Sequence, residues 1–271
     1  MEKEWKDMSV ALIDADSIYF KAACVAKKDK DIEWYINSTM RSIDAACIMP
    51  GLTYVAVKGF GNFRKDLYPE YKANRPPIEE ELSSKLNYGF NYMLDKYDAV
   101  MADGMEADDL VSIWASEARE AELQYIVVGM DKDLLQIPGN HYNFNTKKHE
   151  FIDDDMANYN LMVQCLTGDS GDNIPGIRGI GPKKAQGILQ GVPMDRRWDR
   201  VRAAYRKHSG GDPNLSHRLL SMIKSWDEFE EVRKECEQKK TGDLTRGKSP
   251  SESSVNPSVS TQPTSESEEV T

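Results

Sequence analysis

Eight carboxylates carry the most specific chemical information in this 271-residue sequence. They fall into four short clusters, and three of these clusters lie at or directly after segments that we predict to be strands. Because the carboxyl ends of parallel strands meet at one edge of a sheet, the separate clusters are predicted to form a single group in space. The eight residues are Asp14, Glu106, Asp108, Asp109, Asp131, Asp133, Asp169 and Asp172.

Closely packed carboxylates repel one another and raise one another's pKa values, and divalent cations relieve that repulsion. The clusters contain neither histidine nor cysteine, so their oxygen ligands favour Mg²⁺ or Mn²⁺ over zinc. Two such ions about 4 Å apart can activate a water and stabilise the leaving oxygen in phosphodiester hydrolysis. A serine triad fits poorly, because the sequence has no G-x-S-x-G and its four histidines lie outside the clusters.

The stretch from Leu166 to Leu189 combines acids, glycines and lysines. Asp169 and Asp172 share a face if the turn between them is helical. The glycines allow backbone N–H groups to approach a phosphate, and the helix that Pro182 opens presents an anion site at its N-terminus. The alternative is a surface helix hairpin with ordinary turn glycines, which leaves the upstream acids unexplained. The predicted phosphate-binding residues are Gly176, Gly179, Gly181, Lys183 and Lys184.

Residues Lys58–Pro77 have little apolar periodicity and interleave basic with aromatic side chains. Cations suit phosphates and rings suit unstacked bases, so this stretch is predicted to contact nucleic acid, with Arg64 and Tyr71 among its contacts. The alternative is a mobile surface loop with solvated charges. The residues concerned are Lys58, Arg64, Lys65, Lys72 and Arg75 among Phe60, Phe63, Tyr68 and Tyr71.

Hydrophobic patterning predicts strands that alternate with amphipathic helices, which indicates a parallel α/β sheet flanked by helices. After residue 190 the predicted helices carry many arginines, which suit either a solvated face or a duplex-binding face. The predicted strands are residues 10–14, 53–57, 99–102 and 124–129, with shorter ones near 142–145 and 150–152, and the main early helices are 32–48 and 78–97.

The composition is that of a globular protein, with 39% hydrophobic and 30% charged residues. The four cysteines form no CxxC pair, which favours a reducing cytoplasm and no structural zinc. We expect neither a signal peptide nor a membrane span. The net charge of −10 is concentrated in the eight carboxylates and in residues 241–271, an acidic Ser/Thr-rich tail that is predicted to be disordered. Local basic patches therefore remain free to bind phosphates.

Five segments, in this order over about residues 10–190, resemble the phage and bacterial 5′-nuclease (flap endonuclease) family, which includes the N-terminal nuclease domain of DNA polymerase I. They are LIDADS, FRKDLYPEYKANRPP, EADDLV, VVGMDKDLLQI and LTGDSGDNIPGIRGIGPKKAQGIL. The resemblance implies a PIN-like 5′-nuclease core over residues 1–165, with a helical arch at about 58–97. It also implies a DNA-binding subdomain over residues 166–240, with a helix-three-turn-helix (helix-hairpin-helix) motif at Gly176–Leu189.

The resemblance further implies that the protein is a 5′-3′ exonuclease and flap endonuclease of DNA replication, acting on DNA and on RNA–DNA hybrids. The eight carboxylates would bind two Mg²⁺ or Mn²⁺ ions, Lys72 would contact the scissile phosphate, and Arg75 would lie nearby. A K⁺ ion would help the hairpin to hold duplex DNA. We expect a monomer, encoded by a phage and located in the host cytoplasm, that binds 5′ ends, flaps or branches and meets replication proteins through its tail.

One position departs from the family pattern. The family usually has an aspartate at the end of the second strand, whereas Val57-Lys58 stands there and no carboxylate lies between Val55 and Lys65. One metal ligand is therefore in doubt, and Asp16, two residues beyond Asp14, is a candidate replacement. Two other functions stay open on the sequence alone: a non-cleaving binder of branched DNA, and a PIN-like ribonuclease.

Overall fold

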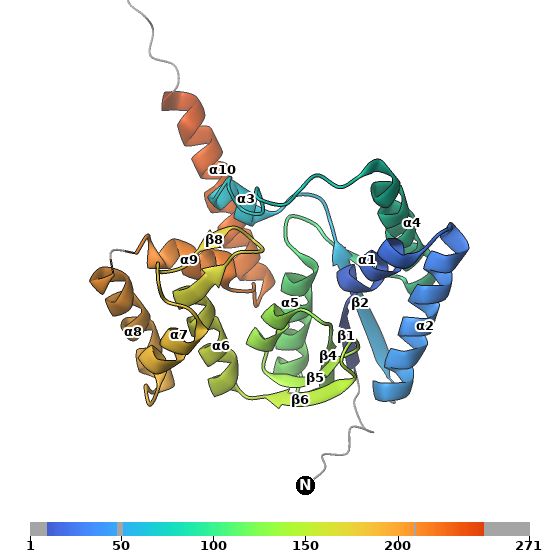
Figure 1. The fold of residues 1–271 in the computed structure, drawn as a ribbon, viewed down its shortest axis with the longest axis horizontal. Coiled ribbons are helices and arrows are strands. Elements are labelled where there is room, and N and C mark those ends of the chain that lie inside the picture. The colour runs from blue at the N-terminus through green and yellow to red at the C-terminus, as the bar shows by residue number, and fades with distance from the viewer. Residues whose placement is uncertain (1–9, 48–50, 209, 247–271) are drawn as a thin grey trace, which may run out of the picture. The chain divides into compact units, whose positions relative to one another are not determined.

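The computed structural model describes residues 10–47, 51–208 and 210–246. Its centre is a six-stranded sheet in the order β3-β2-β1-β4-β5-β6 (Figure 1). All neighbouring pairs are parallel except β5 and β6, which form an antiparallel edge. The predicted α/β fold with a mostly parallel sheet is thereby confirmed. The strands are β1 (Val10–Asp14), β2 (Leu52–Lys58), β3 (Val100–Ala102), β4 (Tyr125–Val128), β5 (Gly139–Asn143) and β6 (Lys148–Ile152).

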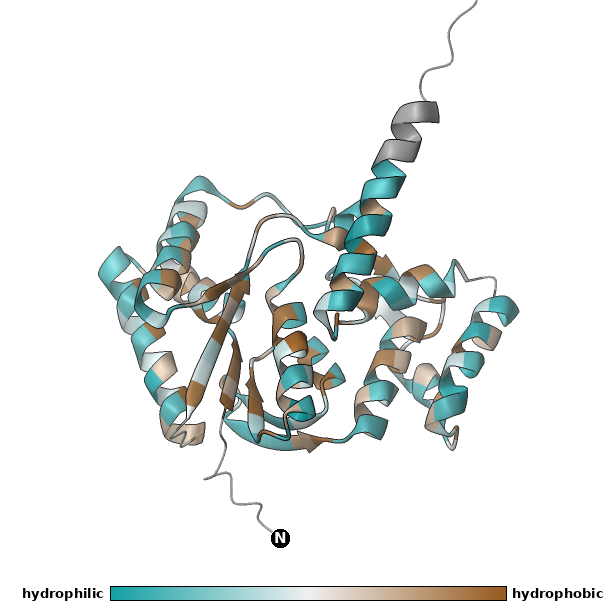
Figure 2. Ribbon diagram, turned by 180° about the vertical axis from the view of Figure 1, so that it is seen from behind, coloured by the Kyte–Doolittle hydropathy of each residue, from teal (hydrophilic) through white to brown (hydrophobic). Residues whose placement is uncertain are grey.

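The two faces of the sheet are covered by different helices because successive strand residues point to opposite sides. From β1, Ala11 and Ile13 join a core with helices α1 (Asp16–Val25), α2 (Asp29–Cys47) and α4 (Glu80–Tyr97). Val10 and Leu12 join a second core under α5 (Ala107–Glu120). Figure 2 shows the apolar strands between helices whose other faces are largely polar. Both faces of β1 are thus buried, and the strand ends in the sheet interior with Asp14.

The helices after the sheet enclose a third hydrophobic cluster that includes Leu166, Leu189 and Val201. Residues up to Cys236 form one compact unit, which includes the sheet and these helices as far as that residue. The elements are α6 (Asp154–Thr167), β7 (Gly168–Asp169), β8 (Ile174–Pro175), α7 (Pro182–Leu189), α8 (Met194–Lys207), α9 (Pro213–Leu220) and α10 (Trp226–Arg246).

The structure decides two local possibilities that the sequence left open and corrects one prediction, that of the tail. The turn between Asp169 and Asp172 is not helical, because it lies inside the small β7–β8 hairpin. Residues 58–77 are not an irregular loop throughout, because Asn62 caps a short helix, α3 (Phe63–Leu67), by accepting the N–H of Arg64. The last helix reaches Arg246, so the first residues of the tail that we predicted to be disordered are helical; residues 247–271 lie outside the described chain.

Helix α4 is the second part of the stretch, about residues 58–97, that we expected to form an arch. It packs against α1 and α2, and Gly89 makes the close approach possible: a Cβ there would lie 3.1 Å from Cβ of Tyr19 and 3.3 Å from Cγ2 of Ile32. Helix α4 is therefore anchored on the sheet-covering layer. None of the helices in the described ranges is long and apolar enough to cross a membrane.

Candidate active site

The predicted carboxylates begin to converge where β1 and β4 end. Asp14 is the last residue of β1 and is only 6% exposed, Asp131 lies three residues beyond β4, and Glu106 caps the start of α5. Burial, and then the nearby charges of Asp16, Asp131 and Glu106, raise the pKa of Asp14 to about 8. Four carboxylates from different elements therefore share one electrostatic environment.

Asp108, in the first turn of α5, faces the same group. Its Oδ1 is buried and has no hydrogen-bond partner in the structure. Burial, and then the charges of Asp109 and Glu106, raise the pKa of Asp108 well above its usual value. An unpaired buried carboxylate oxygen is costly unless a cation or donor binds it, so this atom indicates a ligand position.

A second group of acids lies between β4 and the β7–β8 hairpin. Burial and the charge of Asp131 raise the pKa of Asp133 to about 6, and the Gln164 side-chain amide donates to its Oδ1. Lys132 Nζ lies 2.7 Å from Asp169 Oδ2. Burial alone would raise the pKa of Asp169, but its bond to Lys132 and its backbone N–H donors lower it. We did not predict Lys132 as a site residue, although its position between the predicted ligands Asp131 and Asp133 could have indicated it.

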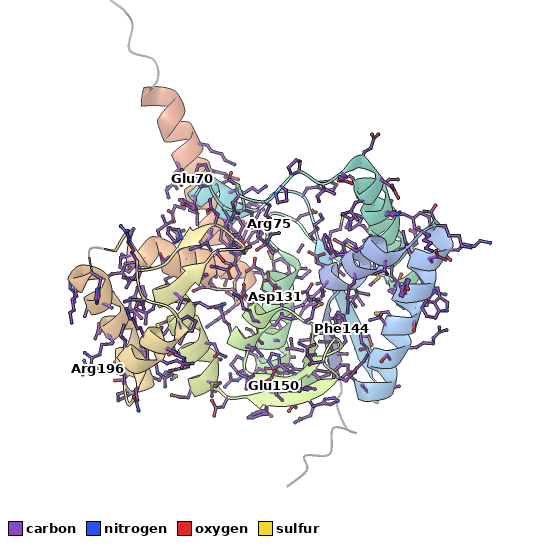
Figure 3. All side chains as sticks on the ribbon, in the orientation of Figure 1. Glu70, Arg75, Asp131, Phe144, Glu150 and Arg196 are labelled. Atoms are coloured by element: carbon purple, nitrogen blue, oxygen red, sulfur yellow. The ribbon has the colours of Figure 1, made fainter. Side chains whose placement is uncertain are left out.

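Asp172 is linked to the first group of carboxylates by Lys72, which contacts both Asp172 and Glu106. Lys72 Nζ donates to Glu106 Oε1 and lies 3.6 Å from Asp172 Oδ2. Arg75 Nη2 donates to Asp172 Oδ1 at 2.7 Å. The Tyr71 hydroxyl lies 2.6 Å from Glu106 Oε2 and 2.9 Å from Asp172 Oδ2, and its one hydrogen can be donated to only one of them at a time. In the view of Figure 3, Asp131 lies between Arg75 and Glu150 of β6.

Hydrogen bonds to backbone carbonyls connect residues 70–75 to the β7–β8 hairpin. Lys72 adopts a left-handed φ of 58°, and its N–H donates to the Asp172 carbonyl at 2.9 Å. The Asn74 side chain donates to the Ser170 carbonyl at 2.7 Å, and the Asn173 side chain donates to the Glu70 carbonyl at 2.8 Å. Because a left-handed non-glycine residue is strained, these contacts must hold Lys72 in place, and they direct its ammonium to Glu106.

Asp109 differs from the other predicted ligands, because its oxygens are already bonded. It is fully buried, and Arg64 binds it in a bidentate pair with distances of 2.5 and 2.8 Å. It also accepts the N–H groups of Glu106 and Ile223. These contacts position Glu106 and make Asp109 a poor candidate for direct metal binding.

Two predicted nucleic-acid contacts are corrected by burial. Arg64 is 3% exposed, and besides Asp109 it donates to the carbonyls of Leu219 and Ser221. Tyr71 is 2% exposed, and its ring belongs to the cluster under α6. Neither side chain can stack on a base or reach a phosphate from this position. Among the arginines of α8, Arg197 is also buried, and it pairs with Asp155 at the start of α6.

The glycines of the predicted phosphate-binding hairpin have different roles. A Cβ at Gly176 would lie 2.1 Å from the Thr167 carbonyl carbon, so this glycine is required by close packing of the backbone. Gly179 has a φ of +80° with open space around it, and Gly181 is also open. Lys183 and Lys184 are exposed at the start of α7, and Lys184 Nζ donates to the Gly179 carbonyl at 2.8 Å. The exposed end of this hairpin remains accessible to a phosphate.

Within the described residues, no set of three or more Asp, Glu, His or Cys side chains already has the geometry to hold a metal ion. Lys72, Arg75 and Lys132 instead lie among the carboxylates as counter-charges. The chemistry of the donors nevertheless fits a hard divalent cation, because all are carboxylates, several have raised pKa values, and Asp108 Oδ1 has no partner.

Comparison with known proteins identifies the family of the chain. The family model of the 5′-3′ exonuclease N-terminal resolvase-like domain matches residues 9–161. DNA polymerase I of Rhizobium leguminosarum is 33% identical over 172 residues, which cover 58% of this chain and 16% of that protein. Flap endonuclease Xni of Shewanella baltica is 32% identical over 152 residues, which cover 51% of this chain and 57% of that protein. The chain thus spans only part of these relatives.

Solved structures share the fold at low sequence identity. A bacteriophage T5 protein crystallised with metal ions is 19% identical and superposes with a TM-score of 0.63, over 88% of this chain and 98% of that one. The T5 5′-exonuclease with divalent zinc is 17% identical, with a TM-score of 0.60 over 85% of this chain and 98% of that one. With its family model matched over more than half of its length, this chain belongs to the 5′-3′ exonuclease family.

Proposed function

We propose that this protein is a metal-dependent 5′-3′ exonuclease and flap endonuclease that hydrolyses phosphodiesters in DNA. One observation carries the proposal: carboxylates from β1, from α5, from the end of β4 and from the β7–β8 hairpin share one site with Lys72 and Arg75. Its relatives are named as a DNA polymerase and a flap endonuclease. The proposed substrates are DNA 5′ ends, flaps or branches, bound by a monomer.

Seven carboxylates would hold the divalent cations, directly or through water. When bound, two Mg²⁺ or Mn²⁺ ions would lower the pKa of the attacking water and stabilise charge on the leaving oxygen. Asp109 would instead keep Glu106 in place through their shared capping contact. The proposed ligands are Asp14, Glu106, Asp108, Asp131, Asp133, Asp169 and Asp172.

Lys72 and Arg75 would bind the scissile phosphate. Each is now paired with a carboxylate of the site, and a phosphate offers the same hydrogen-bond acceptors with more negative charge. Moving onto the phosphate would uncover Glu106 and Asp172 for cations. The two side chains would then neutralise charge that develops in the transition state, an effect that depends on their fixed placement.

Residues 166–240 would bind the duplex beside the cut. The open backbone around Gly179 and Gly181 and the exposed Lys183 and Lys184 suit a DNA phosphate, and a K⁺ ion would fit among backbone carbonyls of this hairpin. Lysines at this end would position the duplex without reading its sequence.

A 5′-labelled flap substrate incubated with Mg²⁺, Mn²⁺ or EDTA tests the proposal. We expect product with either cation, none with EDTA, and loss of product in Asp131→Asn. Binding of the flap without cleavage under all conditions would replace the nuclease by a non-cleaving binder of branched DNA. Cleavage of a single-stranded RNA in preference to the DNA flap would indicate a ribonuclease instead.

A further inference from the structure

One strand that ends near the site, β2, has a lysine at its end, where neighbouring strands end in or lead to a carboxylate. β1 ends in Asp14 and β4 leads to Asp131, but β2, which pairs with β1 through Asp14 and Ala56, ends in Lys58. Lys58 is exposed, and its cationic side chain cannot bind a metal ion in the way that its neighbours can. The edge of the sheet therefore has a gap in its row of carboxylates at β2.

Asp16 fills that gap from a different element. It is the first residue of α1, and its Oδ1 accepts the backbone N–H of Lys58 at 2.8 Å and the hydroxyl of Tyr19 at 2.9 Å. The first of these bonds places the Asp16 carboxylate at the end of β2. Asp14 Oδ1 in turn accepts the Asp16 N–H at 3.1 Å, so the two carboxylates are held next to each other.

We propose that Asp16 supplies, from α1, the carboxylate that the end of β2 lacks, and that it binds a divalent cation together with Asp14. This rests on the proposed function. Two observations support a cation here: Asp14, whose Oδ1 accepts the Asp16 N–H, is 6% exposed, and the Oδ1 atom of Asp108 in the same group of carboxylates is buried without a hydrogen-bond partner.

A purely structural role for Asp16 is the competing explanation, because it joins α1 to β2 and an acid suits a helix N-terminus. The variant Asp16→Asn separates the two roles. Its side-chain carbonyl can still accept the Lys58 N–H and the Tyr19 hydroxyl, but it has lost the negative charge. A structural role needs the acceptor, whereas a metal ligand needs the charge.

Binding of Mn²⁺ alone to the full chain, measured by isothermal titration calorimetry, provides the test. We expect Asp16→Asn to weaken Mn²⁺ binding by about 10–100-fold, the range seen when a group that supports a metal site is removed. The double variant Asp16→Asn, Lys58→Asp should recover most of that affinity, because it returns a carboxylate to the end of β2. The matched control is Asp103→Asn, since Asp103 also accepts a backbone N–H, that of Phe60 at 2.9 Å, just beyond β3. It should bind as the wild type does.

Wild-type affinity in Asp16→Asn, or no recovery in the double variant, would overturn the inference. The variant Asp131→Asn distinguishes this from failure of the proposed function. If the wild type binds Mn²⁺ and Asp131→Asn does not, while Asp16→Asn binds normally, only the role of Asp16 is lost. If the wild type binds no Mn²⁺, the proposed metal-dependent nuclease fails with it.

Discussion

At the scale of single residues, the site is held together by pairs of opposite charge. Lys72 contacts Glu106, Arg75 contacts Asp172 and Lys132 contacts Asp169, so the acids are partly neutralised by cations of the chain itself. The identity of the acids followed from their spacing after predicted strands. The pairs could not be predicted in this way, because their members lie 34, 97 and 37 positions apart in the sequence and meet only in the folded chain.

Substituting Lys72 should slow cleavage far more than it weakens binding. Lys72→Ala removes a cation placed for the transition state, and loss of one such donor costs about 10²–10³ in rate. Lys65→Ala is the control, because Lys65 is exposed on the adjacent helix α3 and forms no ion pair with any carboxylate in the described part of the chain. Single-turnover cleavage of a flap with Mg²⁺, together with its dissociation constant, measures both quantities. Cleavage by Lys72→Ala at the rate of Lys65→Ala would exclude this role.

The buried pair of Arg64 and Asp109 should be important for stability. Arg64→Ala leaves the charge of Asp109 buried without its partner, which typically costs about 3–5 kcal/mol. Arg196→Ala, on the exposed surface of α8, should change the free energy of unfolding by less than about 0.5 kcal/mol. Urea unfolding of both variants gives the comparison. Equal free energies of unfolding for the two variants would contradict a stabilising role of the Arg64–Asp109 pair.

At the scale of elements, hydrophobic patterning predicted the strands and main helices because their periods are local properties of the chain. The burial of Arg64 and Tyr71 could not be predicted in this way. Both stand in a stretch rich in charged and aromatic residues, where the sequence indicates a surface, but α3 and the turn after it pack under residues 219–223 and against α6. A helical turn between Asp169 and Asp172, the condition under which they would share a helix face, does not form because the β7–β8 pairing competes with it.

Two glycines near the end of the proposed DNA-binding hairpin should respond oppositely to alanine. Gly176→Ala brings a Cβ to 2.1 Å from the Thr167 backbone, so we expect the free energy of unfolding to fall by more than about 1 kcal/mol. Gly187 lies within α7 with open space around it, so Gly187→Ala should raise it by about 0.5–1 kcal/mol. Thermal and urea unfolding measure both. A stabilising Gly176→Ala would contradict the packing of this hairpin.

At the scale of the whole molecule, helices on both faces of the sheet contribute residues to the site. Helices α1 and α5 begin where strands end, so Asp16, Glu106 and Asp108 reach the edge at which Asp14 and Asp131 already lie. Family resemblance and strand order together predicted this convergence. The small β7–β8 hairpin contributes to the candidate site from outside the main sheet, and the chain from Leu166 to Cys236 forms one compact unit with that sheet.

The buried histidine of β5 should make the fold sensitive to acid. Burial lowers the pKa of His141 to about 4 from an ordinary value of 6.5, so between these values the unfolded chain binds the extra proton. The stability that this residue contributes is therefore complete above pH 6.5 and is lost as the pH falls toward 4, by up to about 3 kcal/mol. In His141→Gln, which keeps a donor for the Ile137 carbonyl, the free energy of unfolding should depend less on pH over this range. An unchanged pH dependence would contradict the buried neutral state.

Cleavage of a 5′-labelled DNA flap over a series of Mg²⁺ concentrations, by the wild type and by Asp131→Asn side by side, tests the central claim most directly. A common site for the carboxylates predicts that wild-type cleavage rises with Mg²⁺ to a plateau, and that Asp131→Asn needs more Mg²⁺ and reaches a far lower rate. Cleavage that does not depend on Mg²⁺, or that Asp131→Asn performs as well as the wild type, would contradict it.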